Sequence, residues 1–306
     1  MSKGVAPSTF KAYTSAWSSF LMFCYSFQIP LFPILVTTVC SFLVFNFENR
    51  NLKISSIRRL LAGIQFYAKY FNPDFPSLFT DSSVRLLLKG FAKSSTNSPD
   101  KRLPFSLPLL QRLILSLRNG LFSIYSNILL EAVFLTAFYG FMRPGEFTSA
   151  SKRFDPVRGL CLSDLHFSPN FFTLFLKHSK NDSSGSGVSI TISKISNNFC
   201  PFTSMIRFLK IRPRSSDHSP LFSLSNGAPL SKTWFRSHLV SVLKNCSLSP
   251  SLYTGHSFRI GAATTAAERG VPTTAIKILG RWSSSAFESY IRPDLKTILE
   301  AQQALQ

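Results

Sequence analysis

The chain has 306 residues, of which 45% are hydrophobic and 16% are charged, a composition that excludes a disordered protein and leaves room for two compact domains. Thirty-four Lys and Arg residues against fourteen Asp and Glu residues give a formal net charge of +20. Because the basic residues recur along most of the sequence, this charge favours a polyanionic partner, and nucleic acid is a better candidate than no partner at all.

Several classes of functional site are absent from the sequence. The five cysteines are widely spaced and form no C-x-x-C pair, which argues against a zinc site and favours free thiols in a reducing compartment. There is no GxxxxGK[ST] loop, no HExxH, no GxSxG and no carboxylate cluster suited to magnesium. We therefore expect neither a metal nor a nucleotide cofactor.

The N-terminal part, residues 1–95, is predicted to be a helical domain. A first helix begins near Ser8 or Thr9, and its apolar residues recur at the helical period. Residues 12–47 contain no charged side chain, but Pro30 and Pro33 interrupt this stretch. A membrane span needs about 20 uninterrupted apolar residues, so two buried core helices are expected instead, and no membrane partner.

A third helix over residues 51–71 carries basic side chains beside its apolar face. Arg58, Arg59 and Lys69 either contact DNA phosphates or form an ordinary solvated face, and the sequence favours neither. The polar, proline-containing stretch that follows the domain predicts an interdomain linker at residues 96–106. Its Lys101 and Arg102 are further candidates for DNA contact.

The remainder, residues 107–306, is predicted to be a second domain. Apolar helices are expected near residues 107–119 and 126–141. Three runs of strand-like composition, residues 159–167, 170–179 and 187–193, predict a small antiparallel sheet, and the rest is helical. The expected fold class is thus mainly α with a small antiparallel β-sheet (α+β).

The most informative motif is GHSFRIGAATTAAERG, residues 255–270. His256 and Arg259 lie three residues apart at the start of a predicted helix and therefore project from one side. A helix N-terminus with a histidine and an arginine suits a phosphate group. A histidine and an arginine at this spacing are more often structural, and only the neighbouring motifs favour a functional interpretation.

Other residues in order along the chain complete a pattern. Arg143 and Glu146 occur in FMRPGEF, Lys180 follows the second strand-like run, and Trp282 and Tyr290 occur in GRWSSSAFESYIRP. Ser285 and Glu288 there form a possible capping box for a short helix that carries the tyrosine.

From about residue 138 to 293 the sequence resembles the tyrosine recombinases, the family of phage integrases, Xer recombinases and Cre. That family's pattern is an arginine in RxxE, a hairpin lysine, HxxR, a histidine or tryptophan, and a nucleophilic tyrosine. The closing motifs are also similar to recombinases of DIRS-type retrotransposons. Two departures are visible: Trp282 and Tyr290 are eight residues apart instead of the usual nine of Xer-type enzymes, and Lys177 rivals Lys180.

The resemblance implies a function for each residue. Tyr290 attacks a DNA phosphate, Arg143 and Arg259 stabilise the charge on that phosphate, His256 assists proton transfer, and Glu146 orients Arg143. Lys180 is expected to protonate the leaving oxygen, and the indole of Trp282 to donate to the phosphate.

The resemblance also implies an architecture and partners. The two domains are expected to encircle double-stranded DNA as a clamp, in a homotetramer, with strand exchange through a 3′-phosphotyrosyl intermediate, without ATP and in the nucleus. Delivery of the tyrosine in its own subunit or a neighbour's stays open. Two alternatives remain: a domesticated DNA-binding protein that no longer recombines, and a type IB topoisomerase.

Overall fold

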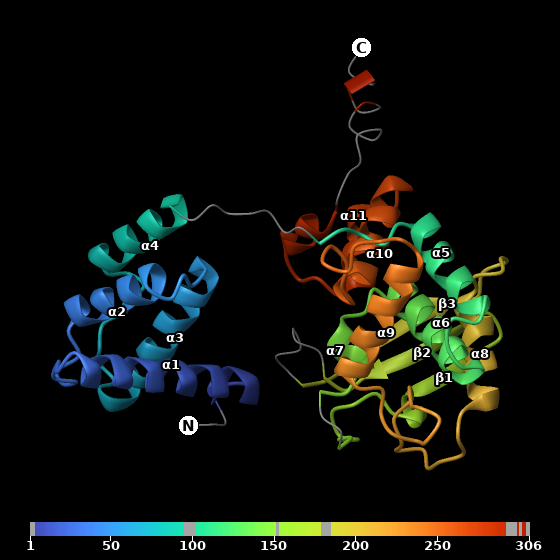
Figure 1. Ribbon diagram of the computed structural model, residues 1–306, viewed down its shortest axis with the longest axis horizontal. Helices are drawn as coiled ribbons and strands as arrows, with labels where there is room; N and C mark the ends of the chain where they lie inside the picture. Colours follow the sequence, from blue (N-terminus) through green and yellow to red (C-terminus); the bar gives the residue numbers. More distant parts are fainter. Residues whose placement is uncertain are drawn as a thin grey trace. The chain divides into compact units, whose positions relative to one another are not determined.

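The fold was analysed in a computed structural model, which describes residues 4–94, 102–150, 153–178 and 185–291, together with residues 299, 302 and 303. The chain divides into two compact units, residues 1–100 (unit 1) and 101–306 (unit 2). Helices dominate both units, and one three-stranded antiparallel sheet lies in unit 2 (Figure 1). The predicted fold class, mainly α with a small antiparallel sheet, is confirmed.

The described residues of unit 1 form four α-helices: α1 (Pro7–Ser26), α2 (Val36–Glu48), α3 (Ile54–Phe71) and α4 (Ser82–Ser94). The uncharged stretch forms α1 and α2, and Pro30 and Pro33 lie in the connection between them. Phe20 on α1 packs edge-on against Phe42 on α2, and both side chains are buried. Within the described residues, no helix has the length and hydropathy that crossing a bilayer requires.

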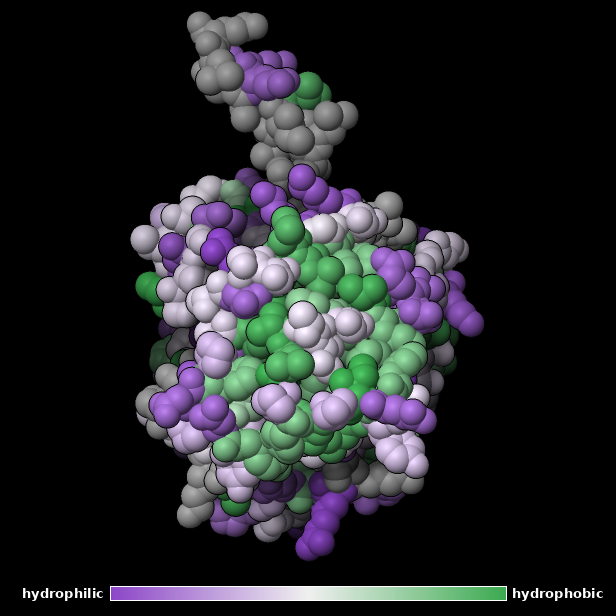
Figure 2. Space-filling view, turned by 90° about the vertical axis from the view of Figure 1, so that its left-hand side faces the viewer, coloured by the Kyte–Doolittle hydropathy of each residue, from purple (hydrophilic) through white to green (hydrophobic). Residues whose placement is uncertain are grey.

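Unit 1 also carries apolar side chains on its surface. Figure 2, which views the molecule from the side of α1–α4, shows a broad hydrophobic area there. The exposed large hydrophobic residues of this unit are Met22, Tyr25, Phe27, Phe32, Leu35, Val44, Tyr70, Phe71, Phe79 and Leu86. An apolar surface of this breadth is typical of proteins that make contacts with other macromolecules.

Unit 2 is built around one central helix. The elements before the sheet are α5 (Leu107–Arg118), α6 (Ile124–Tyr139), the short α7 (Pro144–Phe147) and the 3₁₀-helix η2 (Leu162–Asp164). Those after it are α8 (Pro201–Ile211), α9 (Lys232–Asn245), α10 (His256–Glu268), α11 (Thr273–Gly280) and the 3₁₀-helix η3 (Ser285–Tyr290). Helix α6 is apolar on every side and is buried over most of its length, as a helix in the middle of a core must be.

The sheet has the strand order β1-β2-β3, with β1 at Leu165–Ser168, β2 at Phe171–Leu176 and β3 at Val188–Ser193. Both pairings are antiparallel, and Leu174 on β2 lies opposite Leu165 on one side and Ile190 on the other. Alternate residues of β2 and β3 face the core, because successive side chains of a strand point to opposite sides of the sheet. The sheet therefore joins the core through one face only.

The chain enters unit 2 through a segment that fixes the position of α10. Phe105, which the sequence analysis put in the linker, is fully buried. Its backbone N–H donates to the Ser257 carbonyl at 3.0 Å, and its ring stacks on Tyr253 with 5.0 Å between centroids. Gly261 on α10 approaches this segment so closely that an added Cβ would lie 1.9 Å from the Phe105 carbonyl oxygen. Only glycine permits this contact.

Candidate active site

Four separate segments of unit 2 bring the predicted site residues together. The turn between α6 and α7 carries Arg143, the first turn of α10 carries His256 and Arg259, the segment after α11 carries Trp282, and η3 ends at Tyr290. Helix α10 starts firmly because the side chains of Thr254 and Ser257 accept from the backbone N–H groups of His256 and Thr254, respectively.

The histidine and the tyrosine are direct neighbours. The Nε2 atom of His256 lies 3.1 Å from the phenol oxygen of Tyr290, within hydrogen-bond range, and the tautomer of the ring decides which atom donates. The Thr264 hydroxyl donates to the Tyr290 carbonyl at 3.2 Å. Helix α10 thus holds the tyrosine at both its side chain and its backbone.

Arg259 lies beneath this pair and is fully buried. Its two terminal nitrogens donate to the carbonyls of Phe141 and Gly280, and its guanidinium lies over the Trp282 ring, 4.0 Å from the centroid, in a cation–π contact. Within the described residues its Nε has no hydrogen-bond partner. Burial, followed by the nearby charges of Arg143 and Arg281, lowers the pKa of Arg259 to about 9, so the group remains charged at neutral pH.

Arg143 is held by the carboxylate of Glu146. Its Nη1 donates to Glu146 Oε1 at 3.2 Å, and its backbone N–H donates to Oε2 at 2.8 Å. No other bond of this guanidinium lies within the described part of the chain, so most of its donors stay available. Glu146 therefore contacts Arg143 at both its backbone and its side chain.

A further arginine, Arg281, reaches the same carboxylate. Its Nη2 donates to Glu146 Oε2 at 2.9 Å, and burial, opposed by the Glu146 charge, lowers its pKa. Together with Arg143 and Arg259 it gives the site three guanidinium groups against one carboxylate. The excess positive charge favours an anion between them.

Sequence reasoning did not single out Arg281, although a signal was present. Arg281 is nine residues before Tyr290, which is the Xer-type spacing that Trp282 misses by one. In the structure Trp282 is a buried partner of Arg259, and its ring centroid lies 5.1 Å from that of Tyr290. The described residues offer its indole N–H no hydrogen-bond partner.

Of the two candidate hairpin lysines, the structure describes only Lys177. Lys180 lies outside the described residues. Lys177, just past β2, donates to Asp164 Oδ2 at 2.6 Å and to the carbonyls of Pro156 and Gly159 at 3.0 and 3.3 Å. An ammonium group has three N–H donors, so these contacts use all of them.

The helix that carries Tyr290 differs from the predicted one. It is a 3₁₀-helix, η3, rather than a capped α-helix. None of the hydrogen bonds among the described residues joins the side chain of Ser285 or Glu288 to the backbone amides that a capping box uses. Tyr290 is held instead by long-range contacts with α10, which a local pattern does not reveal.

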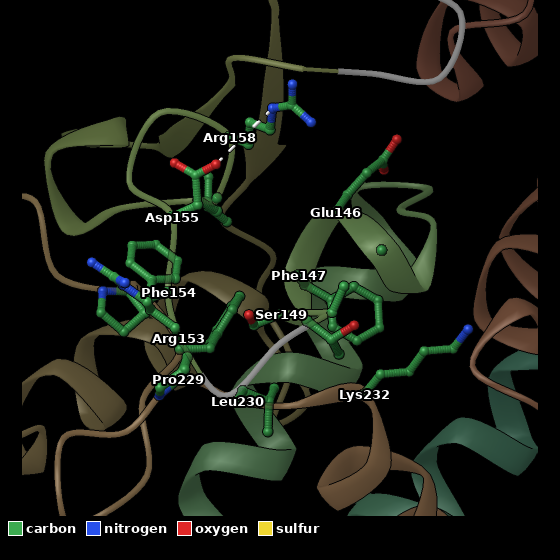
Figure 3. Close-up of a pocket in the computed structure, with 17 residues that line it drawn as sticks. Glu146, Phe147, Ser149, Arg153, Phe154, Asp155, Arg158, Pro229, Leu230 and Lys232 are labelled. Carbon is green, nitrogen blue, oxygen red and sulfur yellow. Dashed lines mark ion pairs between the residues drawn. The ribbon is translucent and has the colours of Figure 1, made fainter. Parts of the chain in front are cut away.

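A pocket of about 380 Å³ lies beside α7 (Figure 3). Phe147 and Leu230 lie in its wall, and three basic residues, Arg153, Arg158 and Lys232, line it as well. Arg158 is paired with Asp155 at 4.0 Å, the dashed line in Figure 3. Against the carboxylates of Glu146 and Asp155, which also line the pocket, the three basic residues leave a small excess of positive charge.

The candidate DNA contacts outside the site are only partly described. Arg58, Arg59 and Lys69 are exposed on α3, and Arg102 is half-buried. Lys101 lies outside the described residues. In the part of the chain that the structure describes, no group of three or more His, Cys, Asp or Glu side chains is placed to hold a metal ion.

Comparison with known proteins shows what this fold is. No family model and no curated protein matches the chain. Three solved structures resemble it: a XerH site-specific recombinase bound to palindromic difH substrate in a post-cleavage complex, a Tn1549 transposon integrase in complex with transposon right end DNA, and a lambda integrase dimer bound to a COC′ core site.

The likeness extends over nearly the whole chain. For XerH, the Tn1549 integrase and lambda integrase the TM-scores are 0.67, 0.67 and 0.61, at 14%, 13% and 15% identity. The matches cover 97%, 98% and 95% of this chain and 78%, 94% and 90% of those chains. At such low identity the likeness concerns the fold, and unit 2 has the fold of a tyrosine recombinase catalytic domain.

Proposed function

We propose that this protein is a site-specific DNA recombinase or integrase that cleaves DNA through Tyr290. The observation that carries the proposal is the 3.1 Å contact between His256 Nε2 and the Tyr290 phenol, directly above the buried cation of Arg259. The net charge of +20 and the recombinase fold support it. A structural tyrosine would not need a histidine and a buried arginine beside its ring.

The proposed chemistry uses these residues in one step. The phenol oxygen attacks phosphorus, a bond to the 3′ phosphate forms, and the bond to the 5′ oxygen breaks. A free tyrosine has a pKa of about 10, so His256 takes the phenol proton as the attack proceeds. Arg143 and Arg259 stabilise the negative charge that builds on the phosphate oxygens.

The leaving 5′ oxygen must gain a proton, and we assign this proton to Lys180. The contacts of Lys177 support the choice, because a lysine whose three donors are bound to Asp164 and two carbonyls has none left for a leaving oxygen. The phosphotyrosyl bond conserves the energy of the phosphodiester, so rejoining to a new strand needs no ATP.

DNA recognition is proposed to involve both units. The exposed basic residues of α3 and those of the pocket beside α7 would neutralise backbone phosphates, which position a duplex without reading its sequence. In the complete complex we propose a clamp around double-stranded DNA and a homotetramer. From the sequence motifs we also propose an origin in a mobile element of the DIRS type and action in the nucleus.

The experiment that tests the proposal traps the covalent intermediate. Random-sequence duplexes are enriched by binding to the protein and re-made with a nick, so that the fragment released by cleavage diffuses away. Denaturing electrophoresis is expected to show a protein–DNA adduct with the wild type and none with Tyr290→Phe. Tyr25→Phe is the matched control for loss of one phenol hydroxyl, since Tyr25 is exposed on α1.

The other outcomes have defined meanings. DNA binding without any adduct would overturn the proposal and favour a silent DNA-binding protein. An adduct accompanied by relaxation of supercoiled plasmid by monomeric protein would favour a type IB topoisomerase. An adduct that persists in Tyr290→Phe would show that another residue is the nucleophile.

A further inference from the structure

Arg281 occupies a backbone position that an arginine rarely takes. Helix α11 ends at Gly280, and Arg281 follows in the left-handed region with φ 56°. Glycine is the usual residue at this position of a helix end because a Cβ makes the conformation costly. Here the glycine is one residue earlier, where a Cβ would lie 1.5 Å from the Trp282 ring. The left-handed position is thus left to a residue with a long side chain.

The side chain of Arg281 makes a set of contacts that offset this cost. Its Nη1 donates to the Gly140 carbonyl at 3.0 Å, and its Nη2 donates to the Phe141 carbonyl at 3.2 Å and to Glu146 Oε2 at 2.9 Å. Gly140 and Phe141 lie in the turn between α6 and α7, and Glu146 lies in α7 itself. Only 10% of the Arg281 side chain is exposed. A planar fork with fixed donors suits several acceptors at once, which an ammonium group does not.

These contacts lock two turns together. Phe141 is itself left-handed, with φ 48°, and its carbonyl accepts from both Arg281 and Arg259. Glu146 receives Arg281 on Oε2 and Arg143 on Oε1. Any displacement of Arg281 therefore moves the carboxylate that orients Arg143.

We propose that Arg281 is a positioning residue for DNA cleavage: it clamps the Arg143 turn to the segment that leads to Trp282 and Tyr290, through Glu146. The inference rests on the proposed function, because it assigns a role within the same site. It also explains why the cleavage motif contains an arginine in place of the glycine that the backbone would prefer.

A purely structural role for Arg281 predicts a different result. If only the backbone turn mattered, Arg281→Gly would relieve the left-handed strain and leave both stability and cleavage at least as high as before. If the clamp matters, two variants separate the contact with Glu146 from the backbone strain. Arg281→Lys keeps a charge that can reach Glu146 and also keeps the strain, whereas Arg281→Gly removes both the charge and the strain.

The test compares wild type, Arg281→Lys and Arg281→Gly, with Ser247→Gly as the matched control. Ser247 is exposed after α9 and is also left-handed, with φ 52°, so it reports the gain from relieved strain alone. Single-turnover cleavage of the nicked duplexes, DNA affinity and thermal unfolding are measured for each protein. Glu146→Gln, alone and combined with Arg281→Gly, reports whether the two residues act together.

The expected result is a rate order of wild type, then Lys, then Gly, with the Gly variant about 100-fold slower, as for a misplacement of about 1 Å. DNA affinity stays within about twofold, Arg281→Gly unfolds no earlier than Arg281→Lys, and the double variant is no slower than the slower single variant. If the wild type cleaves DNA and Arg281→Gly is equally fast and equally stable, the inference about Arg281 is overturned, but the proposed function stands. No adduct from the wild type overturns the proposed function itself.

Discussion

The contact between α10 and the segment at Phe105 gives the sharpest test of how the fold positions the site. In Gly261→Ala the new Cβ would lie 1.9 Å from the carbonyl oxygen of Phe105, 2.6 Å from the carbonyl carbon and 2.9 Å from the backbone nitrogen of the same residue. Real Cβ atoms essentially never lie closer than 3.0 Å to such atoms, so the two segments must separate by at least about 1 Å.

Phe105 has little freedom to give way. Its N–H is bound to the Ser257 carbonyl, and its ring is buried between Tyr253 and Phe258. The displacement therefore falls on α10, whose first turn carries His256 and Arg259. Overpacking of this kind costs about 1–3 kcal/mol, and a shift of about 1 Å at a catalytic group costs about 100-fold in rate.

The assay measures both consequences of Gly261→Ala. For a unit of this size, 1 kcal/mol corresponds to about 2–4 °C in melting temperature, so melting is expected about 2–12 °C below the wild type. Adduct formation on nicked duplexes is expected to fall about 100-fold. Gly90→Ala on α4, where a Cβ meets nothing within 4 Å, is the control and is expected to gain about 0.5–1 kcal/mol.

Two results would refute this reasoning. An unchanged melting temperature in Gly261→Ala would mean that the close approach of α10 to Phe105 does not exist. A lowered melting temperature with unchanged cleavage would mean that the position of α10 does not control the geometry of His256 and Tyr290.

Two further predictions concern Lys177 and the basic face of α3. Burial disfavours the charge of Lys177, but its hydrogen bond to Asp164 and the nearby Cys161 thiol outweigh that effect and raise its pKa. Lys177→Met is therefore expected to cost about 1–3 kcal/mol of stability in urea unfolding while adduct formation continues, and loss of the adduct would assign Lys177 to the chemistry. Since the pKa of Lys177 is raised in the folded protein, the stability difference between wild type and Lys177→Met is full below the ordinary lysine pKa of about 10.4 and shrinks as pH rises further. A difference that grew with pH would contradict this. Arg58→Ala and Lys69→Ala should each weaken DNA binding equally for all sequences and lower the slope of log affinity against log salt by about one, whereas an unchanged slope would mean a solvated face.

The sequence was a good guide wherever the signal is local. The strand-like composition of three runs predicted the sheet, and apolar runs predicted α5 and α6 close to their observed bounds. The order of the site residues along the chain identified the segments that unit 2 brings together. Local patterns suffice here because burial of one face dictates the spacing of apolar residues.

The contacts that hold the site were not predictable in the same way. The bond between Arg281 and Glu146 joins residues 135 positions apart, and no window of sequence contains both. Phe105 lies in a stretch whose prolines and charges are typical of a linker, yet it fills the space that Gly261 leaves open. The expected capping box failed for the same reason, since long-range bonds from α10 hold Tyr290 instead.

The cost of this arrangement explains why the site lies against the most buried helices of the chain. A fully buried guanidinium at Arg259 and two left-handed residues, Phe141 and Arg281, each oppose folding. Such features persist only where the surrounding packing is strong enough to hold them. Helices α6 and α10, buried over most of their length, provide that packing on both sides of the Phe141 carbonyl. Stabilising the site by removing its strain or its charge is therefore expected to remove its chemistry as well.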